Sequence, residues 1–253
     1  MPSPSVLILA GQREGVIDPL CAEAGITRKA VLPLLGRPML NYVLEALEVA
    51  GLDAPFHVSG FDADYDVRLT QSPSAPGPAG SALAALEKDM CLPALLTTAD
   101  HPLLTAEMLE VFLSEASRND ADFSVGLAEK SVIAPAYPNV KRTYLPFSDT
   151  PVSGCNLFYI ANEKGLEAIR FWASAQHYRK RPLKLARQFG LGVFLRLLFR
   201  RLTLDGAFTY ASNRMGIIAK PVLIPIAEAA IDVDKPTDKR LVEQILLARN
   251  QKG

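Results

Sequence analysis

Short apolar runs alternate with helix-like segments along the first half of this chain, and this alternation constrains the fold more than any other feature. The apolar runs lie at 5–11, 54–60, 93–100 and 121–128. Amphipathic segments of helical spacing lie between them, at 39–52, 78–90 and 105–119. Strands that alternate with helices predict parallel crossovers and a sheet that is covered by helices on both faces.

The pattern changes in the second half of the chain. Residues 131–162 are irregular and contain four prolines, and residues 177–204 are both basic and strongly apolar. The end, from 230 to 250, is typical of a strand, a turn and a C-terminal helix. We therefore expect a three-layer α/β/α, Rossmann-like fold with a mostly parallel sheet and a helical insertion near 165–210. No linker or repeat is evident, so the prediction is one domain over 1–253, with 131–210 as a distinct sub-region.

Composition narrows the classes of function. Hydrophobic residues make up 49% of the chain, and 27 basic residues balance 27 acidic ones. A neutral net charge gives no indication of nucleic-acid binding, and we expect none. The three cysteines form no CxxC pair, which argues against a zinc site or a disulfide framework. The N-terminus lacks a signal-peptide pattern and no apolar run reaches about 18 residues, so a cytoplasmic location is expected.

Chemistry in an open parallel sheet gathers outside the carboxyl ends of the strands. Gly11 and Arg13 follow the first apolar run, where a glycine turn admits an anion and an arginine pairs with phosphate oxygens. Neither a GxGxxG nor a Walker pattern is present, and an ordinary strand-to-loop turn fits as well. Asp100 ends the third run, where it is suited either to a divalent cation or to capping a turn.

A second acidic cluster favours the metal interpretation of Asp100. Asp232 and Asp234 alternate along the predicted strand at 230–234 and so point to one side. Asp238 lies at the expected helix start, where a capping role is typical. Two acids from distant segments are expected to meet at one Mg²⁺ ion, with phosphates completing its coordination shell.

Five segments in this order carry a family resemblance. They are VLILAG (6–11), KAVLPLLGRPML (29–40), GPAGSALAAL (77–86), TTADHPLL (97–104) and DVDKPTDKRL (232–241). Together they resemble the MobA-like nucleotidyltransferases, a group with a GT-A type fold that includes sugar-phosphate nucleotidyltransferases and cytidylyltransferases. The resemblance implies Mg²⁺-dependent transfer of a nucleotide from a nucleoside triphosphate, CTP or GTP above all, to a phosphorylated small molecule.

The resemblance also implies roles for single residues. Lys29 would bridge the α-phosphate and the incoming phosphate, and Arg13 would hold the triphosphate, with Arg28 as a competitor for that role. The backbone of Leu9, Ala10 and Gly11 and the small-residue turn Ala79, Gly80 and Ser81 would contact the nucleotide. Asp100 and Asp234 would bind Mg²⁺, with Asp232 as the alternative to Asp234, and Asn156 would touch the acceptor.

Three further features stay open at this stage. Arg142 and Thr143 suit either a pocket for an anionic acceptor or an exposed loop. The segment 177–204 suits a helix packed on its own domain, an acceptor pocket, or peripheral contact with an anionic membrane surface. His101 is interpreted as a structural turn residue.

Two other functions compete with nucleotidyl transfer. A GT-A glycosyltransferase would use a nucleotide sugar and a D-x-D metal motif, which Asp100-His101-Pro102 lacks and Asp232-Val233-Asp234 has. A non-catalytic membrane-surface protein of the same fold is the third hypothesis. Lys29 in its Leu-Pro and Gly-Arg-Pro context favours nucleotidyl transfer.

Overall fold

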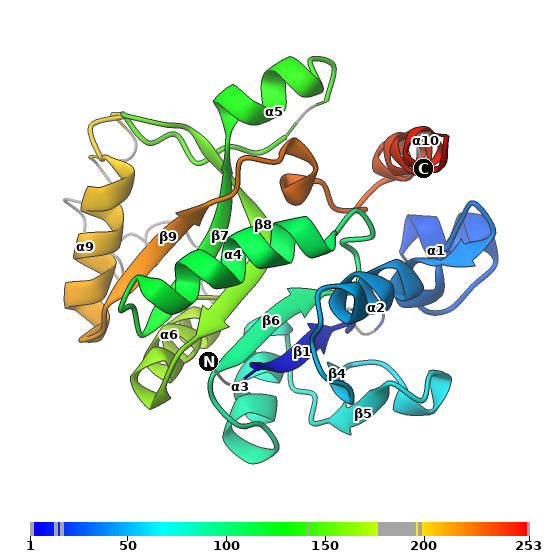
Figure 1. The fold of residues 1–253 in the computed structure, drawn as a ribbon, viewed down its shortest axis with the longest axis horizontal. Coiled ribbons are helices and arrows are strands. Elements are labelled where there is room, and N and C mark those ends of the chain that lie inside the picture. The colour runs from blue at the N-terminus through cyan, green and yellow to red at the C-terminus, as the bar shows by residue number, and fades with distance from the viewer. Residues whose placement is uncertain are drawn as a thin grey trace.

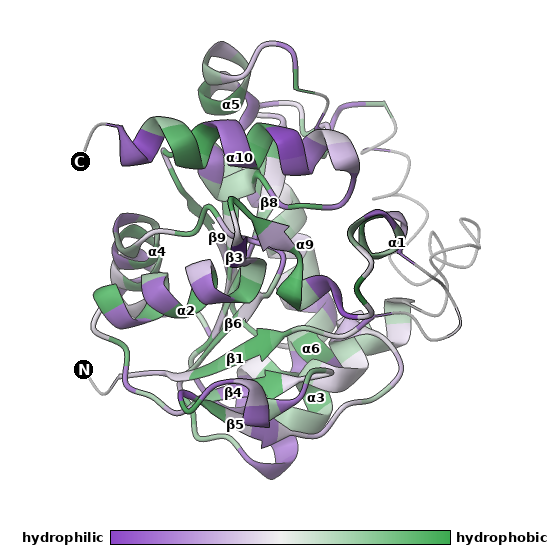
Figure 2. Cartoon of the chain, turned by 90° about the vertical axis from the view of Figure 1, so that its right-hand side faces the viewer, coloured by the Kyte–Doolittle hydropathy of each residue, from purple (hydrophilic) through white to green (hydrophobic). Residues whose placement is uncertain are grey.

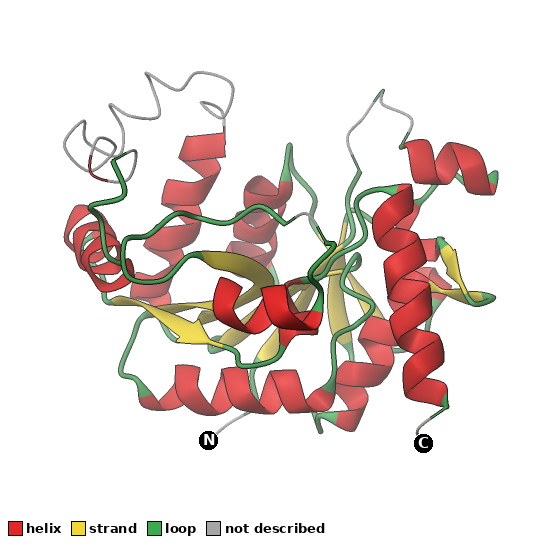
Figure 3. Ribbon diagram, turned by 90° about the horizontal axis from the view of Figure 1, so that it is seen from above, coloured by secondary structure: helices red, strands yellow, loops and turns green. Residues whose placement is uncertain are grey.

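The predicted alternation corresponds to a mixed sheet with helices on both sides (Figures 1 and 3). The computed structural model describes residues 3–12, 15, 18–140, 142–176, 196 and 199–251. In that part of the chain the strands are β1 (Ser5–Leu9), β2 (Pro33–Leu34), β3 (Arg37–Pro38), β4 (Phe56–Ser59), β5 (Leu69–Ser72), β6 (Ala94–Thr98), β7 (Phe123–Glu129), β8 (Val152–Ile160) and β9 (Ala219–Leu223). The α-helices are α1 (Pro19–Ala24), α2 (Met39–Val49), α3 (Pro78–Lys88), α4 (Ala106–Arg118), α5 (Lys130–Ala136), α6 (Leu166–Gln176), α9 (Leu204–Met215) and α10 (Pro236–Asn250). Short 3₁₀ helices are η1 (Lys29–Val31), η2 (Ala63–Tyr65), η3 (Glu163–Gly165) and η4 (Ala227–Ala230).

The main sheet among the described residues has seven strands in the order β5-β4-β1-β6-β8-β7-β9. Strand β8 is antiparallel to β6 and to β7, and all other neighbours are parallel. The predicted mostly parallel sheet is therefore confirmed. In Figure 1 the arrowheads of β1 and β6 point toward the side of the molecule where α1 and α10 lie.

Strand β1 is buried on both faces, which explains its continuous apolar sequence. Val6 and Ile8 pack into the cluster that includes α2 and α4, whereas Leu7 and Leu9 pack against α3 and α6. Successive side chains of a strand point to opposite faces, so one run of five residues serves both layers. The result is the predicted three-layer α/β/α sandwich.

A third apolar cluster fixes the loops beyond the carboxyl ends of the strands. It joins α1, β2, α10 and the segments that follow η1 and precede α10 through buried side chains, namely those of Leu20, Leu34, Val242, Leu32 and Val233. Hydrophobic and hydrophilic residues alternate along α10 (Figure 2), as expected for a helix that packs along one face. This cluster holds the segment before α10 close to η1, which matters for the site described below.

One predicted element is wrong. The strand expected at 230–234 is absent: Ala230 ends the 3₁₀ helix η4, and residues 231–234 follow it without strand structure. The backbone N–H of Val233 donates to the carbonyl oxygen of Asp100 at 2.9 Å. Because the segment runs past the ends of the strands and does not extend the sheet, its apolar residues pack into the loop cluster instead.

Neither edge strand of the main sheet, β5 or β9, was predicted from the sequence. Strand β5 is polar in sequence, and β9 contains Pro221 and has only two of its five residues buried. Edge strands face solvent on one side and tolerate proline, so they lack the apolar signature of central strands.

The helical insertion expected near 165–210 contains α6 and α9. Most of the basic segment 177–204 lies outside the described residues. Among those that are described, no helix combines the length and apolar character needed to cross a bilayer.

Candidate active site

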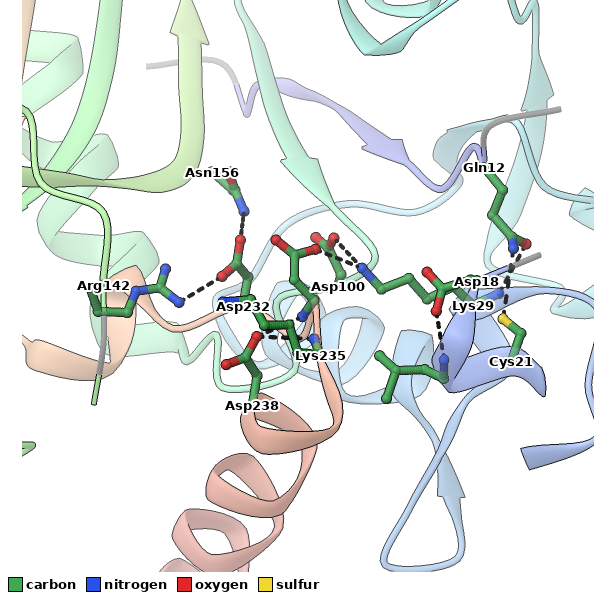
Figure 4. Close-up of polar contacts among 12 residues, drawn as sticks. Gln12, Asp18, Cys21, Lys29, Asp100, Arg142, Asn156, Asp232, Lys235 and Asp238 are labelled. Atoms are coloured by element: carbon green, nitrogen blue, oxygen red, sulfur yellow. Dashed lines mark hydrogen bonds and ion pairs between the residues drawn. The ribbon is translucent and has the colours of Figure 1, made fainter. Parts of the chain in front are cut away.

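Three residues from distant parts of the chain meet beyond the carboxyl ends of β1 and β6. Lys29 Nζ lies 3.1 Å from Asp100 Oδ2 and 2.9 Å from Asp234 Oδ1. Lys29 begins η1, Asp100 follows β6, and Asp234 precedes α10. Figure 4 shows the Lys29 side chain reaching the carboxylate of Asp100. The convergence expected between Asp100 and an acid near the C-terminus is present, and a lysine ammonium lies between the two.

The backbone around Lys29 is anchored by Gln12. The N–H of Lys29 donates to Gln12 Oε1 at 3.0 Å, and Gln12 Nε2 donates to the sulfur of the buried Cys21 at 3.7 Å. The first N–H groups of a helix have no partner within the helix, and Arg28 at the cap position supplies no side-chain bond. A residue from the β1 loop therefore caps the helix that carries Lys29.

Asp234 is held by the start of α10. Asp238 Oδ2 accepts from the backbone N–H groups of Asp234 and Lys235, both at 3.1 Å. This confirms the capping role expected of Asp238. Together with the hydrogen bond from the Val233 N–H to the Asp100 carbonyl, this cap fixes the backbone position of Asp234.

Charge interactions dominate at Lys29, whose side chain is only 15% exposed. Burial lowers the pKa of Lys29, but the carboxylates of Asp100 and Asp234 outweigh it, so the pKa is raised overall. Lys29 is therefore fully charged throughout the neutral range. Asp100 Oδ1 is buried and has no hydrogen-bond partner among the residues that the structure describes.

A second ion pair lies next to the first. Arg142 Nη1 is 2.8 Å from Asp232 Oδ1, and Asn156 Nδ2 donates to Asp232 Oδ2 at 3.4 Å (Figure 4). The backbone of Asn156 has a φ of +53° at an irregularity in the pairing of β7 with β8. Such bulges redirect a side chain, and this one directs Asn156 toward Asp232.

The end of β1 is shaped by a close contact of two glycines. Leu9 and Ala10 are buried and Gly11 is exposed. Gly60, which ends the run after β4, has a φ of +82°, and a Cβ there would lie 2.7 Å from the nitrogen of Gly11. Gly60 is not among the site residues predicted from the sequence, although its place as the glycine that ends an apolar run could have indicated it.

The small-residue turn lies at the start of α3, after Gly77. Ala79 is fully buried, and the hydroxyl of Ser81 bonds both the N–H and the carbonyl of Ala75. The Ser81 side chain thus closes the preceding loop, and Gly80 beside it is half-buried.

None of the remaining candidates that the structure describes takes part in the two ion pairs. Arg13 lies outside the described residues, and Arg28 and Thr143 are exposed. His101 is fully buried, and its pKa is lowered chiefly by that burial. Its carbonyl accepts from the N–H of Leu104, consistent with the structural turn role predicted for it.

Comparison with known proteins identifies the family. A model described as the MobA-like NTP transferase domain matches residues 22–177. The chain belongs to the MobA-like NTP transferase family. It is thus a nucleotidyltransferase, an enzyme class that transfers a nucleoside monophosphate from a nucleoside triphosphate.

Solved structures agree with this assignment. A hypothetical transferase from Thermus thermophilus is 30% identical over 94% of this chain and 100% of that chain, with a TM-score of 0.79. The 2-C-methyl-D-erythritol 4-phosphate cytidylyltransferase of Thermus thermophilus is 17% identical over 96% and 98%, with a TM-score of 0.53. Molybdopterin-guanine dinucleotide biosynthesis protein A from Archaeoglobus fulgidus is 14% identical over 96% and 99%, with a TM-score of 0.52. No curated protein matches the chain. The distant structures establish a shared fold, so the expected GT-A type architecture is confirmed.

The residues of this MobA-like chain fit a divalent cation that also binds phosphate. Asp100 and Asp234 already share one cation, the ammonium of Lys29, and Asp100 Oδ1 has a free acceptor position. Among the described residues, no group of three or more His, Cys, Asp or Glu side chains is arranged to hold a metal unaided. Mg²⁺ typically takes one or two protein carboxylates and fills its shell with water and phosphate oxygens.

A hollow of about 900 Å³ lies away from these residues. It is lined by Met90 and Leu92 before β6, by Asn162 after β8, and by Arg170 of α6. These positions are at the opposite end of the sheet from Lys29. A large hollow there does not compete with the carboxyl edge, where the charged groups converge.

Proposed function

We propose that this MobA-like enzyme transfers a nucleoside monophosphate from CTP or GTP to a phosphorylated small molecule, with Mg²⁺ as cofactor and with release of pyrophosphate. The observation that carries the proposal is the meeting of Lys29, Asp100 and Asp234 at the carboxyl edge of the sheet. It puts one lysine and two carboxylates where an α/β sheet binds its ligands.

The reaction asks little covalent chemistry of the protein. An oxygen of the acceptor phosphate attacks the α-phosphorus in line; the bond from that phosphorus to the bridging oxygen breaks, and pyrophosphate leaves with the electron pair. A phosphate monoester has a second pKa of about 6, so the nucleophile is ionised at neutral pH and no general base is required. Catalysis then rests on positioning and charge neutralisation.

The charged residues divide these tasks. Lys29 would hold the α-phosphate against the acceptor phosphate, and its raised pKa keeps it an ammonium. Asp100 and Asp234 would hold Mg²⁺, which when bound offsets the charge of the triphosphate and of the departing pyrophosphate. We favour Asp234 over Asp232 as the ligand because Asp234 shares the Lys29 ammonium with Asp100, whereas Asp232 is paired with Arg142 and Asn156.

The remaining groups would line the two substrates. The backbone of Leu9, Ala10 and Gly11 and the turn Ala79, Gly80 and Ser81 would lie against the nucleotide, with Arg13 or Arg28 on the triphosphate. Arg142, with Asn156 and Thr143, would receive the acceptor. Arg142 Nε is buried and has no hydrogen-bond partner in the described part of the chain, so the guanidinium has donor capacity left for an anion.

The structural neighbours support CTP or GTP and a phosphorylated acceptor. One is named a cytidylyltransferase of a 4-phosphate and the other a molybdopterin-guanine dinucleotide biosynthesis protein. We also propose a cytoplasmic location, since Cys21, Cys91 and Cys155 are all free thiols.

Thermal unfolding with Mg²⁺ and each of ATP, GTP, CTP and UTP tests the nucleotide. A ligand that binds only the folded state raises the unfolding temperature, so CTP or GTP should give the largest shift. Protection by a nucleotide sugar and by none of the four triphosphates would favour a glycosyltransferase instead. Protection by ATP or UTP alone would overturn the choice of base.

A further inference from the structure

Lys29 occupies the place that the proposed function gives to a metal ion. Its ammonium lies within 3.1 Å of one oxygen from each of the two carboxylates that would bind Mg²⁺. The same ammonium is expected to hold phosphate during the reaction. One side chain therefore has two mutually exclusive sets of partners.

The charges around Lys29 make this conflict consequential. Asp100, Asp232 and Asp234 face Lys29 and Arg142, which leaves the described part of this cluster with an excess of one negative charge. A triphosphate arriving alone meets acids whose only described counter-ions are already paired. A divalent cation arriving alone meets an ammonium between its ligands, and like charges at this range repel.

From this geometry we infer that Lys29 holds the metal position in the unliganded protein and yields it only when metal and nucleotide arrive together. The metal then takes Asp100 and Asp234, and the ammonium turns to the phosphates. Each ligand removes the obstacle to the other, so their binding is positively coupled. Binding free energies are linked reciprocally, so the metal strengthens nucleotide binding by the same factor as the nucleotide strengthens metal binding.

This inference rests on the proposed function and adds a coupling between metal binding and nucleotide binding that the function itself does not require. An ion pair with a purely structural role would stabilise the loops around η1 but would not compete with a metal. In that case removing the ammonium would leave two carboxylates without their described partner and a less stable protein, with no gain in metal affinity. The two cases differ in the affinity for metal alone.

The test is a titration of the whole protein with Mn²⁺, in the absence of nucleotide, followed by electron paramagnetic resonance. Methionine keeps the length and apolar stem of lysine but removes the charge, so we expect Lys29→Met to bind Mn²⁺ at least tenfold more tightly than wild type. Arg142→Met removes a neighbouring cation that pairs with Asp232 and is the matched control, for which we expect little change. Equal tightening in both variants would show a general charge effect and overturn the inference.

Wild-type protein supplies a second measurement in case Lys29→Met does not fold. Mn²⁺ together with CTP or GTP should raise the unfolding temperature by more than the sum of the two separate shifts. A shift with Mn²⁺ alone that equals the shift with both ligands would overturn the exchange. If no triphosphate protects wild type with or without Mn²⁺, the proposed function itself fails, which is a different result.

Discussion

At the scale of single residues, the site depends on side chains that hold others in place. Gln12 is the clearest case, because it caps the helix that begins with Lys29 and reaches it from the end of β1. Nothing in the residue type or spacing of Gln12 marks it as important. Its partner lies 17 positions away, and only the folded chain brings them together.

Gln12→Ala should reduce turnover roughly fivefold, the equivalent of about 1 kcal/mol for one lost hydrogen bond. The loss should fall on kcat more than on KM, since the bond positions Lys29 and does not itself touch substrate. Cys21→Ala is the control: it removes the other partner of Gln12 but leaves the bond to Lys29. Unchanged kcat in Gln12→Ala would show that Gln12 has no positioning role.

A salt bridge outside the site gives a prediction with pH. Side-chain hydrogen bonds from Arg68 lower the pKa of Asp66, and burial opposes this effect. The backbone N–H and the positive charge of Arg68 also lower this pKa. A lowered folded-state pKa means that stability is present above the unfolded value, about 3.9, and is lost as the pH falls through the folded value. Asp66→Asn should therefore cost about 1 kcal/mol near neutral pH and progressively less in acid.

Urea unfolding of Asp66→Asn and wild type across that range measures the difference. Asp53→Asn serves as a comparison, since Asp53 is exposed in the loop before β4 and forms no salt bridge with any described residue. A difference between Asp66→Asn and wild type that persists undiminished in strong acid would contradict the assignment.

At the scale of elements, the proposed nucleotide side of the site depends on how closely β1 and β4 approach. Gly11 and Gly60 meet where these strands end, and Gly60 combines a φ of +82° with no room for a Cβ. The same approach exposes the backbone at Gly11 for contact with a ligand. The close contact between the ends of β1 and β4 is thus already present in the protein without ligand.

Gly60→Ala should weaken protection by nucleotide and destabilise the fold by more than the ~1 kcal/mol that a positive φ costs a non-glycine residue. Gly51→Ala is a matched control, because Gly51 has a φ of +73° but no atom within 4 Å of an added Cβ. We expect Gly51→Ala to lose only the conformational cost and to keep nucleotide binding. Equal losses of binding in both variants would rule out the close contact as the cause.

At the scale of the whole molecule, the central strands and helices could be predicted from the sequence, whereas the edge strands and the segment before α10 could not. Strands buried on both faces, such as β1 and β6, carry continuous apolar runs, and helices such as α4 carry a cap and one apolar face. The edge strands β5 and β9 have no such pattern. Residues 231–235 were misjudged because an apolar run packs equally well in a sheet or in a loop cluster.

The candidate site divides in the same way. Asp100 and an acid near the C-terminus were expected to meet from their positions at the ends of predicted strands. The family resemblance added Lys29 to them. Three other features of the site depend on how distant segments come together. They are the ion pair of Arg142 with Asp232, the bulge at Asn156 and the cap from Gln12. No spacing or periodicity encodes them.

We also propose a peripheral membrane contact outside the candidate site. Phe199 is 67% exposed, and Arg200 and Arg201 beside it are exposed as well. An aromatic side chain next to arginines suits an anionic bilayer surface. The protein should co-sediment with vesicles containing anionic lipid, and Arg200→Glu with Arg201→Glu should abolish this. Sedimentation with neutral vesicles to the same extent would contradict an electrostatic contact.

Release of pyrophosphate is the direct measure of nucleotidyl transfer by this protein. Wild-type protein with Mg²⁺, CTP or GTP and a panel of sugar and polyol phosphates should release pyrophosphate with at least one acceptor. Lys29→Ala and Asp100→Ala should each reduce that release by several orders of magnitude while unfolding at temperatures close to that of wild type. Wild-type turnover in either variant would contradict the account, as would a wild-type enzyme that releases no pyrophosphate with any pairing.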